Sequence, residues 1–511
     1  MTTSRRKFIQ RSSLLAAGTL LPLGCSDHSD RPTPGERTAI VIGSGFAGSV
    51  AALRLGQAGI STIVLERGQQ WSVTGPDTFP TTTNFDRRGA WSIPASGSSS
   101  AGQPGYAGLL ETVPGENVSA VCGACLGGGS LVYGGVLIQP AQDVFEQVFP
   151  YLGYQDMDSI YYPRVLAALG AAPIPDDVLA SPNYAAHRTF IEDTSALGYE
   201  VRRPHTGFDW DIVRQEINGE IPAAASIGEY AFGCNSNAKL STDKNYLLDA
   251  VATGNVAIRS LTEVELIRER NPAGYAVVCR RISAEGEVLE EYELVTDYLF
   301  MAAGSMNTTR LLLKSQHAGE LRGANDRIGH GWGTNGDLLL AQLHPDVSSG
   351  AQGGPACIAA TDKSNPAHTV TFMHSPVSIA PLQLQMSMAI PDRTGQLIYN
   401  GETDATVIDW ESDAGTPSIL AQQASFDRIV DSNGGAAAPF IEGQIWHPLG
   451  GAVMNDACDT LGELYGYRNL FVVDGSLLPG SAAGVNPALT VAANAERIME
   501  AITDGLARSS S

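Results

Sequence analysis

Residues 38–66 read TAIVIGSGFAGSVAALRLGQAGISTIVLE, and the fold class can be predicted from these residues. A short apolar run over 38–42 leads into a glycine turn, and a helical pattern then continues to Gly59. A second apolar run over 61–65 ends at Glu66. Strand, glycine turn, helix and strand in this order form the βαβ unit that is typical of dinucleotide-binding proteins.

The three glycines and the acid of this unit each have a physical role. Gly43 permits the tight turn, Gly45 lets the backbone approach a pyrophosphate, and Gly48 lets the helix pack closely on the strand. The helix N-terminus presents unpaired N–H groups and its positive dipole end to the phosphates. Glu66 can accept hydrogen bonds from both ribose hydroxyls and would repel a 2′-phosphate, which disfavours NADP despite the neighbouring Arg67. The motif alone does not separate FAD from NAD.

Later segments have the pattern of the same α/β layer. An apolar run over 296–301 leads through a glycine turn into a helical pattern over 306–314. Near the C-terminus a strand pattern over 469–473 leads to an Ala-rich helix over 488–502. Because these segments lie far apart in the sequence, we expect the stretches between them to form a second, inserted domain. Residues 331–346 and 370–410 alternate like antiparallel strands, which predicts a sheet over the cofactor.

Composition excludes several classes of partner. The chain has 511 residues, with 32 Lys and Arg against 54 Asp and Glu, and a formal net charge of −22. This balance argues against nucleic acid and anionic lipid surfaces, because both attract clustered Lys and Arg. Seven cysteines are too sparse for a disulfide scaffold, and we expect no metal site, because Cys122 and Cys125 have no second pair or nearby His. We interpret this pair as structural or as a local disulfide, with a redox role as an alternative.

The N-terminus predicts export. Arg5 and Arg6 precede a short apolar stretch that is about half of what a bilayer needs, so residues 1–24 resemble a twin-arginine (Tat) signal. Residues 25–37 are a polar tether. We therefore expect a periplasmic or extracellular protein. Leu23-Gly24-Cys25 also resembles a lipoprotein cleavage site, although Pro22 stands where such signals usually have Leu, so a lipid anchor at Cys25 stays open.

Other glycine-rich motifs are less generic. The run GGGSLVYGGV at 127–136 lies in an apolar context, which usually means that the backbone passes close to something flat or charged. The motif WHPLGG at 446–451 displays one titratable side chain, His447, between an aromatic residue and a proline. Gly484-Val-Asn486-Pro begins the last helix and puts Asn486 at or near an N-cap.

The ordered set of motifs resembles the glucose–methanol–choline (GMC) oxidoreductases, and among them the bacterial cholesterol oxidases that bind FAD without a covalent link. The matching stretches run from residue 40 to 498 and include GGGSLVYGGV, TDKNYL, LFMAAGS, GWGTNGD, WHPLGGAV and NLFVVDGSLLPGSAAGVNPALTVAANAERI. The resemblance implies an α/β fold, in which a Rossmann-type FAD-binding domain is interleaved with an α+β substrate-binding domain that contains a mostly antiparallel sheet. We assign the FAD-binding domain to 38–70, 238–328 and 466–505 with a flavin loop at 122–138, and the substrate-binding domain to 71–237 and 329–465.

The resemblance also implies a set of FAD-binding residues. Those expected to hold the ADP half are Gly43, Gly45, Gly48 and Glu66, with the backbone of Val264 at the adenine. Those expected along the pyrophosphate and the isoalloxazine are Gly128, Gly129, Ser130, Gly134 and Gly135. Those expected at the ribityl chain and the flavin ring are Asp474, Gly475, Asn486 and Pro487.

His447 and Asn486 match the family's catalytic pair, which meets the substrate hydroxyl. Oxidation of an alcohol removes the O–H proton while a hydride leaves the carbon for flavin N5. A His that titrates near neutral pH can take that proton, and an amide near the ring can support developing charge.

Two positions depart from the family. The Glu that moves a proton between steroid carbons falls here at Met373, and a thioether cannot act as an acid or base. The adjacent His374 would face the opposite side of a strand. Tyr133 stands where the family has Asn, and this change is expected to narrow or re-aim the pocket.

These residues favour FAD-dependent oxidation of a sterol or a similar bulky apolar alcohol to the ketone, without efficient double-bond isomerisation. The electron acceptor is dioxygen or another acceptor such as a quinone or cytochrome. Two alternatives are a GMC dehydrogenase for another alcohol and a flavin- or lipid-binding protein without turnover.

Overall fold

A parallel sheet joins strands from both ends of the chain. In the computed structural model its five strands run in the order β22-β12-β1-β2-β8, and every neighbouring pair is parallel. The strands are β1 (Thr38–Ile42), β2 (Ser61–Leu65), β8 (Val256–Arg259), β12 (Tyr298–Met301) and β22 (Leu470–Val472). The central strand β1 is buried along most of its length, as its continuous apolar run requires in a sheet that is covered on both faces.

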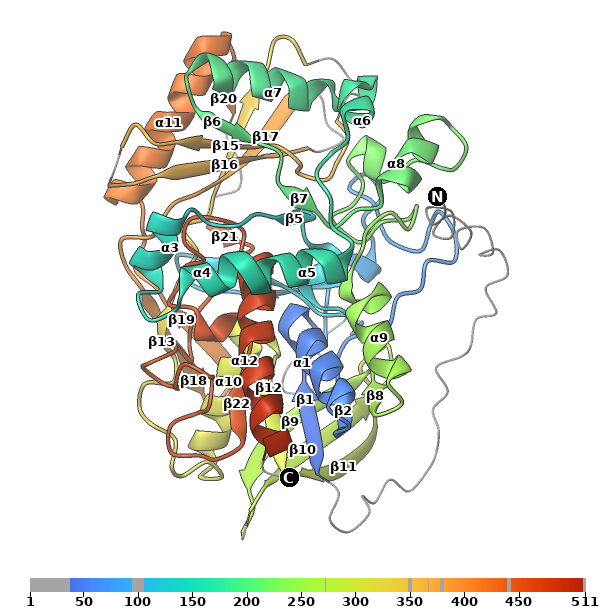
Figure 1. The fold of residues 1–511 in the computed structure, drawn as a ribbon, viewed down its shortest axis with the longest axis vertical. Helices are drawn as coiled ribbons and strands as arrows, with labels where there is room; N and C mark the ends of the chain where they lie inside the picture. Colours follow the sequence, from blue (N-terminus) through green and yellow to red (C-terminus); the bar gives the residue numbers. More distant parts are fainter. Residues whose placement is uncertain are drawn as a thin grey trace, which may run out of the picture. The chain divides into compact units, whose positions relative to one another are not determined.

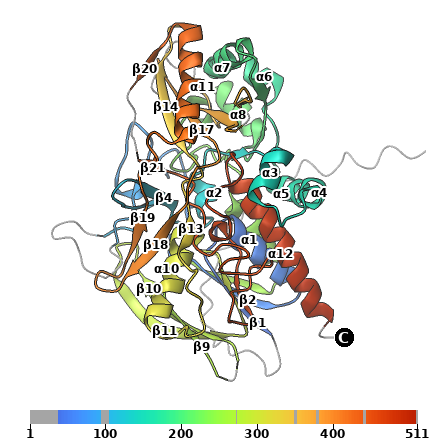
Figure 2. The same cartoon turned by 90° about the vertical axis from the view of Figure 1, so that its left-hand side faces the viewer.

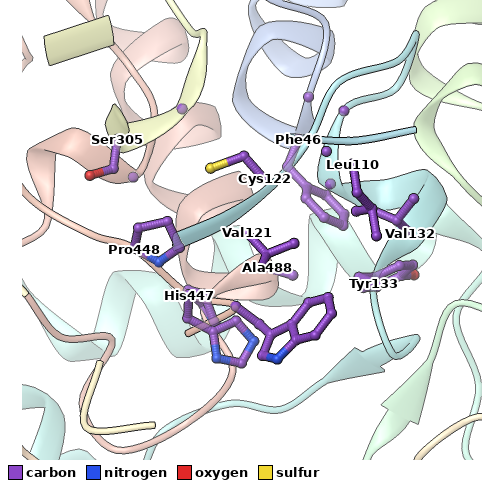
Figure 3. Close-up of a pocket in the computed structure, with 18 of the residues that line it drawn as sticks. Phe46, Leu110, Val121, Cys122, Val132, Tyr133, Ser305, His447, Pro448 and Ala488 are labelled. Atoms are coloured by element: carbon purple, nitrogen blue, oxygen red, sulfur yellow. The ribbon is translucent and has the colours of Figure 1, made fainter. Parts of the chain in front are cut away.

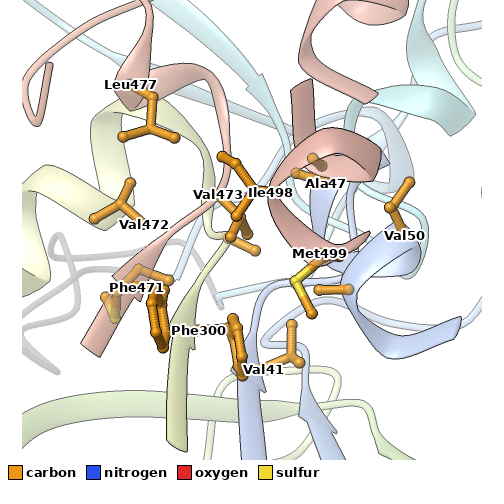
Figure 4. Packing of buried hydrophobic residues seen from close by; sticks show 14 of the residues in the cluster. Val41, Ala47, Val50, Phe300, Phe471, Val472, Val473, Leu477, Ile498 and Met499 are labelled. Carbon is orange, nitrogen blue, oxygen red and sulfur yellow. The ribbon is translucent and has the colours of Figure 1, made fainter. Parts of the chain in front are cut away.

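Helices cover both faces of this sheet. α1 (Phe46–Gln57) and α12 (Ala488–Arg508) lie side by side on one face, and α10 (Gly304–His317) lies on the other (Figures 1 and 2). Val41, Val50 and Ile498 are fully buried between the sheet and the helix pair (Figure 4). Each such side chain contributes about 1.5–3 kcal/mol through burial.

A buried ion pair also ties α12 to its neighbours. Glu496 has no exposed side-chain surface and accepts two hydrogen bonds of 2.7 Å from the guanidinium of Arg54 on α1. It also accepts from the hydroxyl of Tyr246 at 2.9 Å, at the start of α9 (Tyr246–Ala252). Arg164 of α5 (Tyr162–Leu169) also pairs with Glu496 at 3.5 Å, so the charge of Glu496 connects α12 to three other helices.

A second, antiparallel sheet lies above the first (Figure 1). Its strand order is β20-β14-β17-β16-β15-β6, and α7 (Ala185–Ala196) and α11 (Pro417–Asn433) cover one face. Its strands are β6 (Glu200–Arg202), β14 (Leu338–Leu343), β15 (Ala359–Asp362), β16 (Val370–Ser375), β17 (Leu382–Met388) and β20 (Ala436–Ala438). Side chains alternate between the two faces. Met373 therefore faces away from the helices, whereas the buried His374 contacts His187 of α7, as the sequence predicted.

A two-stranded sheet of β5 (Val136–Leu137) and β7 (His205–Thr206) and three three-stranded sheets complete the fold of the described residues. One is β9 (Thr262–Glu269) with β10 (Tyr275–Ile282) and β11 (Val288–Thr296), and another is β13 (His330–Trp332) with β18 (Gly395–Asn400) and β19 (Ala405–Asp409). A third is β3 (Leu110–Val113) with β4 (Ser119–Gly123) and β21 (Gln444–Ile445). The architecture confirms the predicted Rossmann-type layer interleaved with a mostly antiparallel sheet.

The structure describes residues 37–93, 105–271, 273–347, 352–365, 367–376, 381–438 and 443–508. The predicted signal and Cys25 lie outside these ranges, as does all of the predicted tether except Arg37. From Arg37 onward the chain is a single compact unit, so the predicted boundary between FAD-binding and substrate-binding domains stays a prediction. None of the helices in the described ranges has the length and apolar character needed to cross a bilayer.

Candidate active site

A cavity of about 460 Å³ lies between the two main sheets. It begins at the carboxyl ends of β1, β2, β12 and β22, where ligands bind in open α/β sheets, and it reaches the face of the antiparallel sheet that the helices leave uncovered. Its volume is typical of a cofactor or ligand pocket. Phe46, Tyr133 and His447 line it from three separate segments (Figure 3).

The first glycine loop has the geometry that a diphosphate needs. Gly43 has a φ of +100°, and a Cβ there would lie 2.3 Å from the carbonyl oxygen of Ala302. A Cβ at Gly48 would lie 2.1 Å from the carbonyl oxygen of Gly43, so Gly48 serves helix packing and does not line the cavity. Gly45 does line it, and a Cβ there would meet nothing within 4 Å. Gly45 is also the N-cap of α1 and has no side chain to cap the first N–H groups, which stay available to a ligand.

Glu66 lies where the sequence placed it, directly after β2 and in the cavity wall. One carboxylate oxygen accepts from the backbone N–H (3.1 Å) and the hydroxyl (2.6 Å) of Ser44, and the other accepts from Gly68 N–H (2.8 Å). Burial raises the pKa of Glu66. Arg67 pairs with Glu111 and lies over the ring of Trp91, 4.6 Å from its centroid. Since these contacts occupy its guanidinium, Arg67 has little capacity left to bind a 2′-phosphate.

The second glycine loop, residues 127–135, packs directly against the first. A Cβ at Gly128 would lie 2.9 Å from the Cα of Gly45, and Gly127 N–H donates to the hydroxyl of Ser44 at 3.0 Å. Gly128, Gly129 and Gly134 line the cavity, and a Cβ at Gly129 or Gly134 would meet no atom within 4 Å. Two predicted residues lie behind this wall. Ser130 is buried and donates to the carbonyl of Gly127 (2.6 Å), and Gly135 is packed against the ring of Phe208. Ser130 and Gly135 therefore shape the loop without lining the cavity.

The remaining predicted cofactor residues, Val264, Asp474, Gly475 and Pro487, all line the cavity. Asp474 accepts four hydrogen bonds, from the backbone N–H of Gly304 (2.7 Å), the hydroxyl of Thr308 (2.6 Å), and the N–H (2.9 Å) and hydroxyl (2.5 Å) of Ser476. These contacts tie the end of β22 to the start of α10. Burial raises the pKa of Asp474. Its predicted contact with a ribityl chain stays a prediction.

The predicted catalytic pair meets at the cavity wall. His447 Nε2 lies 3.4 Å from Asn486 Nδ2, and both residues line the cavity. Asn486 precedes α12 by two residues, and its buried Oδ1 has no hydrogen-bond partner among the described residues. His447 Nδ1 lies 2.8 Å from a carboxylate oxygen of Asp337, a buried residue that was not among the predicted site residues. The signal was present, since Asp337 ends the quoted motif GWGTNGD.

The two departures from the family also lie at the cavity. Met373 lines it beside its cross-strand partner Met386. Tyr133 packs edge-on against Phe46 (ring centroids 5.3 Å apart), and its hydroxyl lies against Gly207, away from any hydrogen-bond partner among the described residues. The buried Lys239 holds this segment by donating to the carbonyls of Leu131 and Tyr133, each at 2.9 Å.

The cysteine pair separates into two environments. Cys122 lines the cavity, whereas Cys125 is buried beside the second glycine loop. Both are free thiols, so the local disulfide considered from the sequence does not form here. Burial raises the pKa of the Cys122 thiol to about 12. It is therefore a poor nucleophile at neutral pH.

Comparison with known proteins agrees with this geometry. Family models described as GMC oxidoreductase match residues 38–331 and 417–495. The chain belongs to the GMC oxidoreductases. This family generally binds FAD, and membership makes the chain an alcohol oxidoreductase.

Several GMC relatives cover most of the chain. It is 24% identical to a cholesterol oxidase of Acinetobacter baumannii, over 91% of this chain and 94% of the relative. It is 26% identical to a cholesterol oxidase of Mycobacterium tuberculosis, over 90% of this chain and 89% of the relative. A long-chain-alcohol oxidase of Arabidopsis thaliana is 23% identical over 92% of this chain and 67% of the relative. In fold, the chain resembles pyridoxine 4-oxidase from Mesorbium loti, with a TM-score of 0.63 and 16% identity over 91% of this chain and 99% of that one.

Proposed function

We propose that this protein binds FAD and oxidises the hydroxyl of a sterol or a similarly bulky apolar alcohol to the ketone. The observation that carries the proposal is the pair formed by His447 and Asn486, which faces an otherwise largely apolar part of the cavity. The apolar lining of that part comes mainly from the antiparallel sheet and its neighbours, namely Val136, Tyr230, Leu339, Ala356, Met373, Leu384 and Met386. Such a wall favours a substrate with one hydroxyl and a large hydrocarbon body.

The glycine loops support FAD as the cofactor. Gly45, Gly129 and Gly134 leave open space where any larger side chain would extend into the cavity. The first backbone N–H groups of α1 have no side-chain cap and can donate hydrogen bonds to a phosphate. The unpartnered Oδ1 of Asn486 supplies a hydrogen-bond acceptor in the cavity wall. When bound, FAD provides the acceptor for the hydride that leaves the alcohol carbon.

The protein's own residues handle the hydroxyl. His447 Nε2 accepts the hydroxyl proton, a step that typically contributes about 10²–10⁴-fold. Asn486 Nδ2 lies 3.4 Å from this nitrogen and can donate a hydrogen bond to the substrate oxygen, which orients the hydroxyl. The surrounding apolar wall excludes water from the proton transfer.

The same cavity supports oxidation without isomerisation. Isomerisation needs a base beside the steroid carbons, and Met373 cannot serve as one. Within the described ranges, the carboxylates that line the cavity are Glu66, Glu263 and Asp474. They lie at the ends of β2 and β22 and on β9, and none of them belongs to the antiparallel sheet that holds Met373.

Anaerobic titration of the FAD-loaded protein tests the proposal. We expect cholesterol to bleach the flavin absorbance, and His447→Ala to keep its yellow colour while reduction slows by about 10²–10⁴-fold. His317→Ala, at an exposed position at the end of α10, is the matched control and should be reduced at the normal rate. Bleaching by a long-chain alcohol or a sugar but not by cholesterol would favour a GMC dehydrogenase or oxidase for another alcohol. A protein that stays colourless after FAD is supplied would contradict FAD binding.

The electron acceptor and the location are part of the proposal. We propose dioxygen as the acceptor, with a quinone or cytochrome as the alternative, and peroxide release during turnover distinguishes them.

We also propose Tat-type export, which rests on the sequence of residues 1–24. Replacement of Arg5 and Arg6 by Lys should retain the protein in the cytoplasm of a bacterial host. An unchanged distribution would contradict this route.

A further inference from the structure

Asp337 lies behind the imidazole of His447 and faces it directly. It follows β13 and immediately precedes β14, and its side chain is only 2% exposed. Its Oδ1 is 2.8 Å from His447 Nδ1, and its Oδ2 accepts from the backbone N–H of Trp446 at 3.3 Å. Within the described residues, the carboxylate forms an ion pair only with His447. A buried carboxylate without Lys or Arg beside it is best stabilised when that imidazole becomes positively charged.

The turn that carries Asp337 holds both halves of the catalytic pair. Asn335, at a φ of +60°, donates to the carbonyl of Val485 (3.0 Å) and accepts from the N–H of Ala482 (2.8 Å). The backbone of Gly333 exchanges two hydrogen bonds with Leu449, at 2.9 and 3.1 Å. These contacts connect the segment before Asn486 and the segment after His447 to a single turn. Small movements of that turn would change the 3.4 Å separation between His447 and Asn486.

We propose that Asp337 is a positioning residue for His447, an inference that rests on the proposed function. Its carboxylate accepts the Nδ1–H and so selects the tautomer in which the lone pair of Nε2 faces the cavity. When the substrate O–H bond breaks, its proton forms a new N–H bond at Nε2. The resulting imidazolium is then paired with the carboxylate. An Asp in this position acts through His447 and does not touch the substrate.

In the alternative role, Asp337 is purely structural and only joins two loops. The substitution Asp337→Asn distinguishes the positioning role from this structural role. Asn keeps the size of the side chain and can still accept from Trp446 N–H, so the loops stay joined. Its amide can donate to His447 Nδ1, which forces the proton onto Nε2 and removes the base from the cavity. We expect kcat for flavin reduction to fall by about 10²–10⁴-fold, with FAD content, the melting temperature and KM close to those of the parent protein.

Asp193→Asn is the matched control. Asp193 makes the same kind of contact with His344, at 3.0 Å, and neither residue lines the cavity. This substitution should leave the rate of flavin reduction unchanged. A fall as large as that of Asp337→Asn would mean that loss of any buried Asp–His pair disturbs the enzyme, and it would overturn the proposal.

A measurement without turnover completes the test. In protein labelled with ¹⁵N-histidine, the signals of His447 are identified by their absence in His447→Ala. We expect the parent protein to carry the proton on Nδ1 and Asp337→Asn to carry it on Nε2. A parent protein with the proton on Nε2 overturns the proposal even if Asp337→Asn fails to fold, as does an unchanged tautomer in a folded variant. Failure of every alcohol to reduce the parent flavin would instead contradict the proposed function. The effect of Asp337 on the tautomer of His447 would then be tested by the ¹⁵N measurement alone.

Discussion

Two buried imidazoles between the antiparallel sheet and α7 should make the protein sensitive to acid. His187 of α7 and His374 of β16 have no exposed surface, and their ring centroids are 4.7 Å apart. Burial lowers the pKa of His187 to about 3, with the nearby carbonyl of Pro355 opposing the shift and Arg188 adding to it. Burial also lowers the pKa of His374 well below its ordinary value, and the neighbouring His187 and His344 add to this shift.

The sign and size of the effect follow from proton linkage. Between about pH 6.5 and pH 3 the unfolded chain binds a proton at His187 that the folded chain does not, so the free energy of unfolding falls as the pH falls through this window. One pH unit corresponds to about 1.36 kcal/mol, so at about pH 5 the contribution of His187 is a loss of about 2 kcal/mol. His374 acts in the same direction.

Replacement of His187 by Phe tests this account. Phe keeps an aromatic ring against Tyr184 and His374 but binds no proton. Urea unfolding of the FAD-loaded protein, followed by circular dichroism at about pH 7.5 and pH 5, should show that the variant loses about 2 kcal/mol less than the parent on acidification. His317→Gln, at an exposed position, should leave the acid-induced loss unchanged. An equal loss in His187→Phe and the parent protein would refute the reasoning.

Three further substitutions have expected outcomes. Glu496→Gln should lower the free energy of unfolding by about 3 kcal/mol, because it leaves Arg54 mostly buried without its charged partner, and an unchanged urea midpoint would contradict this. Gly45→Val should leave the fold intact, because a Cβ at this position meets open space, but the larger side chain should abolish FAD binding. A variant that is purified with full flavin would show that the cofactor lies elsewhere. Met373→Glu should increase the fraction of isomerised ketone formed from cholesterol, as measured by chromatography, and no change would count against the alignment of Met373 with the family's Glu.

The sequence alone was sufficient for the parts of the fold that local chemistry determines. Gly43 and Gly48 could be interpreted from the 38–66 stretch, because a strand, turn and helix within one short window leave few conformations, and only glycine avoids the close contacts with Ala302 and with Gly43 itself. The alternation along β16 likewise predicted that Met373 and His374 face opposite sides. The order of motifs indicated the family, which the family models confirm.

Which side chains meet was decided by the tertiary structure. Asp337 and His447 are 110 residues apart, and no local pattern connects them. Arg67 lies next to Glu66 in sequence, yet its charge is taken up by Glu111. Gly129 and Ser130 are adjacent in the second loop, and the sequence does not indicate which of them faces the cavity. In the structure Gly129 lines the cavity, whereas Ser130 points behind it. The physical reason is that backbone preferences act over a few residues, whereas hydrogen bonds and ion pairs need directions and distances that arise only once distant segments have packed together.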